Sequence, residues 1–144
     1  MFKTHDKKFT FHITGAKFPT DLEPWIRDNI VYEGFVNDMD SFLTNMDIAL
    51  APSFFGAGMQ QKIFEPISRG FPTVTNERGL AGYPFVPGQD VLVAESVQEY
   101  CKALESLVPS PFRQKLSQNA KHKSKQLFQQ DISDQIVRTE LESL

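Results

Sequence analysis

Apolar residues in this chain form two kinds of pattern, short continuous or alternating runs and longer stretches with helical spacing. The short runs predict strands at residues 9–14, 30–35, 48–51, 73–75 and 91–94. The longer stretches predict helices at residues 21–28, 40–46, 60–69, 98–107, 111–130 and 131–144. Strands and helices that alternate in this way predict an α/β fold, a Rossmann-like, doubly wound parallel sheet with helices on both faces.

Residues at the element boundaries support this assignment. Asp38 or Asp40 is the expected N-cap of the helix at 40–46. Gly70 stands where a helix needs a left-handed residue at its end, and Pro111 suits the first turn of the long helix that follows. The run at 48–51 (IALA) is almost continuously apolar, so it is expected to be a strand buried on both faces of the sheet.

The composition is that of a soluble globular domain and narrows the possible partners. The 144 residues are 40% hydrophobic and 23% charged, which suffices for one core without disulfides or a structural metal. The formal net charge of -3 argues against nucleic acid as the main partner. Cys101 is the single cysteine, which favours a reducing compartment. No apolar run resembles a signal peptide or a membrane span, so we expect a cytoplasmic location.

The most informative stretch is residues 47–74, DIALAPSFFGAGMQQKIFEPISRGFPTV, where an apolar strand leads through two glycines into a helix. Gly56 and Gly58 let a ligand approach the backbone, and the helix start beyond them offers unpaired N–H groups that attract phosphate. Glu65 is a lone carboxylate among apolar residues, which is costly unless it accepts hydrogen bonds, for instance from sugar hydroxyls. These features point to a nucleotide-like ligand. On the residues alone, an equal alternative is a flexible connection that only allows close packing, with Glu65 on the solvated face.

Four segments of the sequence resemble, in order and spacing, the C-terminal domain of GT-B glycosyltransferases of family 4, the glycosyl transferases group 1. They are IVYEGFVNDMDSFLTNMDIALAPS, GAGMQQKIFEPISRGFPTVT, GLAGYPF and DVLVAES, within a match over residues 8–128. The most specific part is G-x-x-x-K-x-x-E at residues 58–65, followed by R-G-x-P-x-V at 69–74. The resemblance implies that the domain binds the nucleotide half of a sugar donor.

The same resemblance assigns roles to particular positions. It implies that Glu65 holds the ribose hydroxyls, that the loop at 34–36 lies beside the base, and that amides of 58–60 face the diphosphate and the transferred sugar. Lys62 is the one basic side chain of the loop placed to assist. No catalytic residue, metal or cofactor is assigned to this chain, because the nucleotide-diphosphate sugar is the substrate. The expected donor-binding residues are Gly34, Phe35, Val36, Gly56, Gly58, Met59, Gln60, Lys62 and Glu65.

Two departures from the family pattern change the interpretation. Many members carry a second glutamate where this chain has Ala57, so sugar contact would fall to backbone amides and to Gln60 or Gln61, as in a similar-looking GAG subgroup. The chain also begins at what resembles the second strand of the family's C-terminal domain, so it lacks the first strand–helix unit and the N-terminal domain. We therefore expect a partial nucleotide-sugar-binding, Rossmann-like domain at 1–130 and a C-terminal helix at 131–144.

The resulting expectation is donor binding in a retaining glycosyltransferase of cell-surface polysaccharide or glycoconjugate synthesis, with negligible activity in this chain alone. The alternatives are a non-catalytic nucleotide-binding or interaction module, and a GT-B relative such as a nucleotide-sugar 2-epimerase. In a doubly wound sheet the absent strand would be central, so the strands at 9–14 and 48–51 must pair directly, or a partner must fill the gap. We expect self-association or completion by a missing N-terminal domain.

Three further groups of residues give weaker indications. The histidines at 5, 12 and 122 lack the spacing of metal ligands, so no metal site is expected. The helix at 111–130 is basic and amphipathic and could contact an anionic membrane, although a solvated helix face is the more common explanation. The phenylalanines that flank the proposed site are expected to pack in the core; they are Phe54, Phe55 and Phe85.

Overall fold

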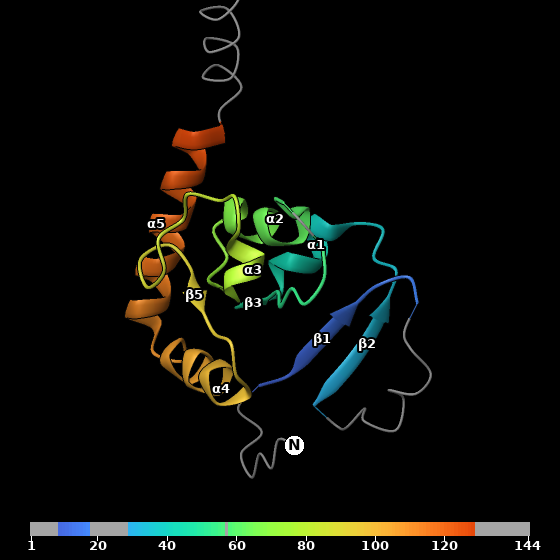
Figure 1. Ribbon diagram of the computed structural model, residues 1–144. Helices are drawn as coiled ribbons and strands as arrows, with labels where there is room; N and C mark the ends of the chain where they lie inside the picture. The colour runs from blue at the N-terminus through green and yellow to red at the C-terminus, as the bar shows by residue number, and fades with distance from the viewer. Residues whose placement is uncertain (1–8, 18–28, 57, 129–144) are drawn as a thin grey trace, which may run out of the picture. The chain divides into compact units, whose positions relative to one another are not determined.

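The computed structural model describes residues 9–17, 29–56 and 58–128, which form two compact units, Met1–Met46 and Asp47–Leu144 (Figure 1). All strand pairs among these residues are parallel, and helices separate most of the strands. This arrangement confirms the predicted α/β class, because parallel pairing requires crossover connections of the kind that helices provide.

The first unit contains a two-stranded parallel sheet and one short helix. Strand β1 (Phe11–Thr14) pairs with strand β2 (Ile30–Gly34), with Phe11 opposite Ile30. Helix α1 (Met39–Thr44) follows β2, and Asp38 is its N-cap, which decides between the two caps expected from the sequence. The helices predicted at 21–28 and 131–144 lie outside the described residues.

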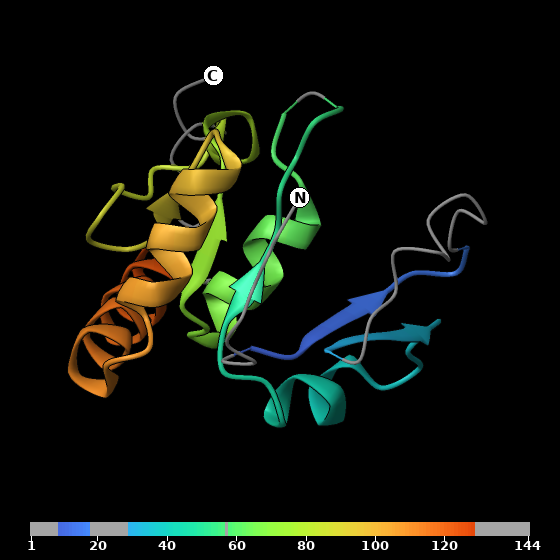
Figure 2. The same ribbon diagram turned by 90° about the horizontal axis from the view of Figure 1, so that it is seen from below.

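The second unit contains a three-stranded parallel sheet in the order β3-β4-β5. Its strands are β3 (Ala49–Leu50), β4 (Thr73–Thr75) and β5 (Leu92–Val93). Its helices are α2 (Gln61–Arg69), α3 (Glu77–Leu80), α4 (Val97–Ser106) and α5 (Ser110–Phe128). Helix α2 packs against β4 and α5, and α4 packs against β4 and β5 (Figures 1 and 2). Helix α3 had no counterpart among the predicted elements.

The core of the second unit forms around α2. Ile63 and Ile67 of this helix are fully buried against Ala120 of α5 and against apolar side chains from the loop before β5. Gly70 ends α2 with φ 88°, in the left-handed region that the sequence pattern required. Its carbonyl accepts a hydrogen bond from Ser117 Oγ of α5, so the end of α2 is fixed to the long helix.

The burial of β3 differs from the expectation. All three residues of β4 are buried, whereas Leu50 in β3 is 41% exposed. The reason is topological: β4 lies in the middle of its sheet, and β3 pairs with β4 on one side only among the described residues. Direct pairing between the strands at 9–14 and 48–51 stays a prediction.

Candidate functional site

The glycine-containing turn lies where β3 leads into α2. Gly56 has φ 102° and Gly58 has φ 72°, backbone conformations that residues with a β-carbon rarely adopt. The turn stands at the carboxyl end of its strand, where open α/β sheets bind ligands. Gln60 is the N-cap of α2, but its side chain makes no hydrogen bond to the N–H groups of the first helical turn.

A buried asparagine joins this turn to the next strand. Asn76, directly after β4, accepts hydrogen bonds through Oδ1 from the backbone N–H of Ser53 at 3.0 Å and of Gly79 at 3.2 Å. Its Nδ2 donates to the Ser53 carbonyl at 2.9 Å. One side chain therefore continues the β3–β4 pairing past the end of the strands and also caps α3.

Both the backbone and the side chain of Gln60 accept hydrogen bonds from neighbouring side chains. The Tyr83 hydroxyl donates to the Gln60 carbonyl at 2.9 Å, and burial raises the pKa of this hydroxyl. Ser53 Oγ donates to Gln60 Oε1 at 2.7 Å. Gln60 Nε2 lies only 3.3 Å from the position that a β-carbon on Gly56 would take. The Gln60 side chain therefore occupies the space beside Gly56, and a ligand that contacts this glycine must displace it or bind alongside it.

Two basic side chains donate to the turn from different helices. Lys62 Nζ of α2 donates to the Pro52 carbonyl at 3.1 Å, which places it on the turn as expected. Arg78 Nη1 of α3 donates to the Gly56 carbonyl at 3.2 Å. Sequence reasoning did not select Arg78, although its position shortly after β4 puts it at the same edge of the sheet as the turn.

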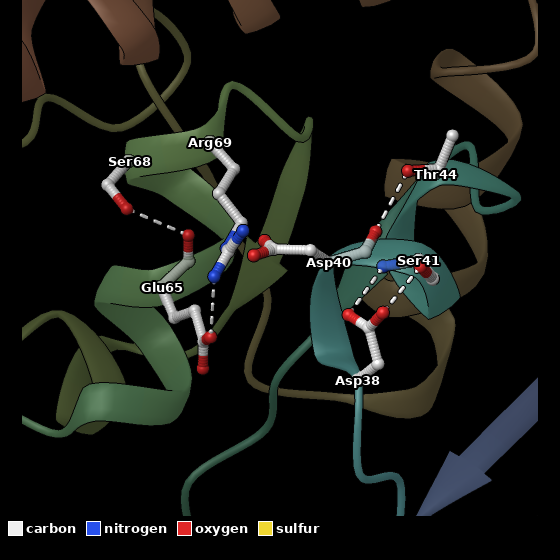
Figure 3. A network of polar contacts seen from close by, with 7 residues as sticks. All are labelled: Asp38, Asp40, Ser41, Thr44, Glu65, Ser68 and Arg69. Atoms are coloured by element: carbon white, nitrogen blue, oxygen red, sulfur yellow. Dashed lines mark hydrogen bonds and ion pairs between the residues drawn. The ribbon is translucent and has the colours of Figure 1, made fainter.

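Glu65 lies on α2, and its side chain is 31% exposed. Arg69 Nη2 donates to Glu65 Oε1 at 3.1 Å, and Ser68 Oγ donates to the Glu65 main-chain carbonyl at 2.9 Å (Figure 3). The carboxylate is thus neither buried among the apolar residues nor unsupported. Its second oxygen, Oε2, is not part of the Arg69 pair and keeps acceptor sites for a ligand.

The exposed face of the turn is apolar. Phe55 is 87% exposed, and Phe54 and Met59 are also more than half exposed. Phe85, in contrast, is buried in the core and stacks on Tyr83. The expectation of core packing was therefore right for Phe85 and wrong for the two phenylalanines of the turn, because the turn extends beyond the end of the sheet that could cover them.

The remaining predicted residues belong to the first unit. Gly34 ends β2 with φ 70°, Phe35 is 70% exposed, and Val36 is half-buried. In the loop that follows, Asp38 accepts hydrogen bonds from the Ser41 hydroxyl and amide, which lower the pKa of its carboxyl group (Figure 3). These residues form a local loop structure within the first unit.

Neither a metal-binding cluster nor a membrane-spanning helix is found among the described residues. Among the described residues no group of three or more histidine, cysteine or carboxylate side chains could hold a metal ion. No helix in the described ranges combines the length and the apolar character needed to cross a bilayer. Contact of the basic helix with a membrane surface stays a prediction, as does self-association.

Several solved structures share this fold. Anabaena Alr3699/HepE, solved in complex with UDP, superposes with a TM-score of 0.76 at 16% sequence identity, over 94% of this chain and 41% of that one. The C-terminal domain of the glycosyl transferase group 1 family protein LpcC from Francisella tularensis superposes with a TM-score of 0.58 at 18% sequence identity. The match covers 71% of this chain and 55% of that one. Sucrose-phosphate synthase from Thermosynechococcus elongatus superposes with a TM-score of 0.65 at 15% sequence identity, over 81% of this chain and 31% of that one.

These likenesses confirm the predicted Rossmann-like fold of a GT-B C-terminal domain, and this chain spans about 41% of the length of HepE. No curated protein sequence matches the chain. The family model described as glycosyl transferases group 1 matches residues 2–109, which is most of the sequence. This chain therefore belongs to the glycosyl transferases group 1 family.

Proposed function

We propose that this chain binds the nucleotide-diphosphate part of a sugar donor, as the donor half of a retaining family 4 glycosyltransferase of the GAG form that builds surface polysaccharide or glycoconjugate. The observation that supports this best is the turn between β3 and α2. It combines two glycines at positive φ, a helix start without a side-chain cap, and two basic side chains. Together these features suit a diphosphate, which carries several negative charges and many acceptor oxygens.

The structural neighbours support the same ligand class. HepE has been solved with UDP, with UDP and glucose, and with UDP-glucose. In the proposed mode, the diphosphate lies against the backbone of residues 58–60, and Glu65 Oε2 accepts hydrogen bonds from the ribose. Transfer itself requires acceptor binding and positioning by residues outside the proposed donor site.

The ribose contact is tested by calorimetric titration of the chain with UDP, GDP and ADP, and with the 2′,3′-dideoxy form of whichever binds. Wild type should prefer the ribose form by about tenfold, the effect of losing hydrogen bonds to a charged acceptor. Glu65→Gln should remove this preference, and Glu105→Gln on the exposed face of α4 should leave it unchanged. Equal discrimination by wild type and Glu65→Gln would refute the ribose contact.

Of the non-catalytic alternatives, an interaction module that binds no nucleotide is the second candidate, and one observation favours it. Side chains of the protein itself already contact two of the candidate residues, since Gln60 lies beside Gly56 and Arg69 pairs with Glu65. In that case the titrations show no binding of any of the three nucleoside diphosphates, while the chain remains folded by circular dichroism.

A further inference from the structure

Helix α3 holds Arg78 in a fixed position beside the glycine turn. Its start is capped by Asn76, and the Glu77 N–H donates to Glu95 Oε1 at 2.6 Å. Its third residue, Gly79, packs so closely that an added β-carbon would lie 2.2 Å from Thr75 Oγ1. These contacts fix the backbone on both sides of Arg78, so the guanidinium is presented to the turn by a rigid support.

The guanidinium is exposed and has donors to spare. Arg78 Nη1 donates to the Gly56 carbonyl, and a guanidinium has five N–H donors in a planar fork. Lys62 binds the carbonyl of Pro52 in the same turn. Both cations thus bind carbonyl oxygens of the turn, and this offsets the partial negative charge with which these oxygens would repel an anion. Both cations also add positive charge beside the turn.

From this geometry we propose that Arg78 is a second basic residue of the donor site and binds the diphosphate directly. The inference rests on the proposed function and names the side chain that recognises the charged part of the donor. The fork geometry of the guanidinium matches two phosphate oxygens, a bidentate contact that the ammonium of Lys62 cannot make.

The test compares Arg78→Gln, Arg78→Lys and wild type by calorimetry. The ligands are the nucleoside diphosphate that wild type prefers among UDP, GDP and ADP, and the corresponding nucleoside. Glutamine removes the charge, and because its side chain is two bonds shorter than that of arginine, the nucleoside titration reports any loss of support for the turn. Arg78→Gln should bind the diphosphate about tenfold or more weakly and the nucleoside with unchanged affinity. Arg78→Lys should lie between Arg78→Gln and wild type.

Lys125→Gln, at the exposed end of α5, removes the same charge elsewhere and should leave both affinities unchanged. An Arg78→Gln variant that binds the diphosphate as wild type does would overturn the inference and leave the proposed function standing. Equal weakening of diphosphate and nucleoside binding would also overturn it, because that result indicates support of the turn rather than phosphate contact. If wild type binds none of the three diphosphates, both proposals fall together.

Discussion

Replacing Asn76 by alanine tests the link between the two strand ends that present the turn. The side chain is 5% exposed and makes three hydrogen bonds, two with the backbone of Ser53 and one with the Gly79 amide. Ser53 is itself fully buried, so water cannot replace the lost partners of its N–H and carbonyl groups. The substitution therefore leaves two buried backbone groups unsatisfied and removes the cap of α3.

The expected loss of stability follows from these contacts. Each buried backbone group left without a partner costs about 1 kcal/mol or somewhat more. Loss of an N-cap costs about 1 kcal/mol. The free energy of unfolding should therefore fall by about 3 kcal/mol, a large part of the roughly 5–15 kcal/mol that stabilises a domain.

Urea denaturation followed by circular dichroism measures this loss. With a slope of about 2 kcal/mol/M, the midpoint of Asn76→Ala should fall by about 1.5 M relative to wild type. Asn119→Ala is the matched control, because Asn119 is only half-buried and donates one solvent-exposed hydrogen bond, at 3.0 Å, to the Gln89 carbonyl. Its midpoint should move by less than about 0.5 M. A shift for Asn76→Ala as small as that of the control would refute the reasoning.

Two further predictions concern the ends of helices in the second unit. Gly70→Ala should lower the free energy of unfolding, measured by urea titration, by about 1–2 kcal/mol, and this loss should exceed that of Gly88→Ala. Both glycines have positive φ, but only at Gly70 would the new β-carbon lie 3.2 Å from a lysine side chain of α5, so equal losses would contradict this close contact. Hydrogen bonds from the backbone amides of Glu95 and Ser96 lower the pKa of Glu99 below its usual value of 4.5. The resulting stability is present above pH 4.5 and is lost as the pH falls through the lowered pKa, so wild type and Glu99→Gln should differ in melting temperature at neutral pH, and this difference should shrink as the pH is lowered below 4.5. A difference that stays constant throughout the acid titration would contradict the assignment.

The local features of the fold followed from the sequence by itself. Asp38 caps α1 and Gly70 ends α2 as expected, because capping depends on a residue and its neighbours within one turn. The strands and the long helices appear within a few residues of their predicted positions wherever the structure describes them. The glycine turn and the family were also recognisable, since both are encoded in residues close together along the chain.

Only the tertiary structure decided which distant groups meet at the turn. Asn76 binds Ser53 across 23 positions, and Arg78 reaches Gly56 across 22. Both contacts exist because β3 and β4 lie next to each other in register, which brings the loops after them together. The pairing of Glu65 with Arg69 and the side chain of Gln60 beside Gly56 were equally invisible in the sequence pattern. Residue spacing shows which side chains share a face of one element, whereas the contacts between elements depend on packing of the whole unit.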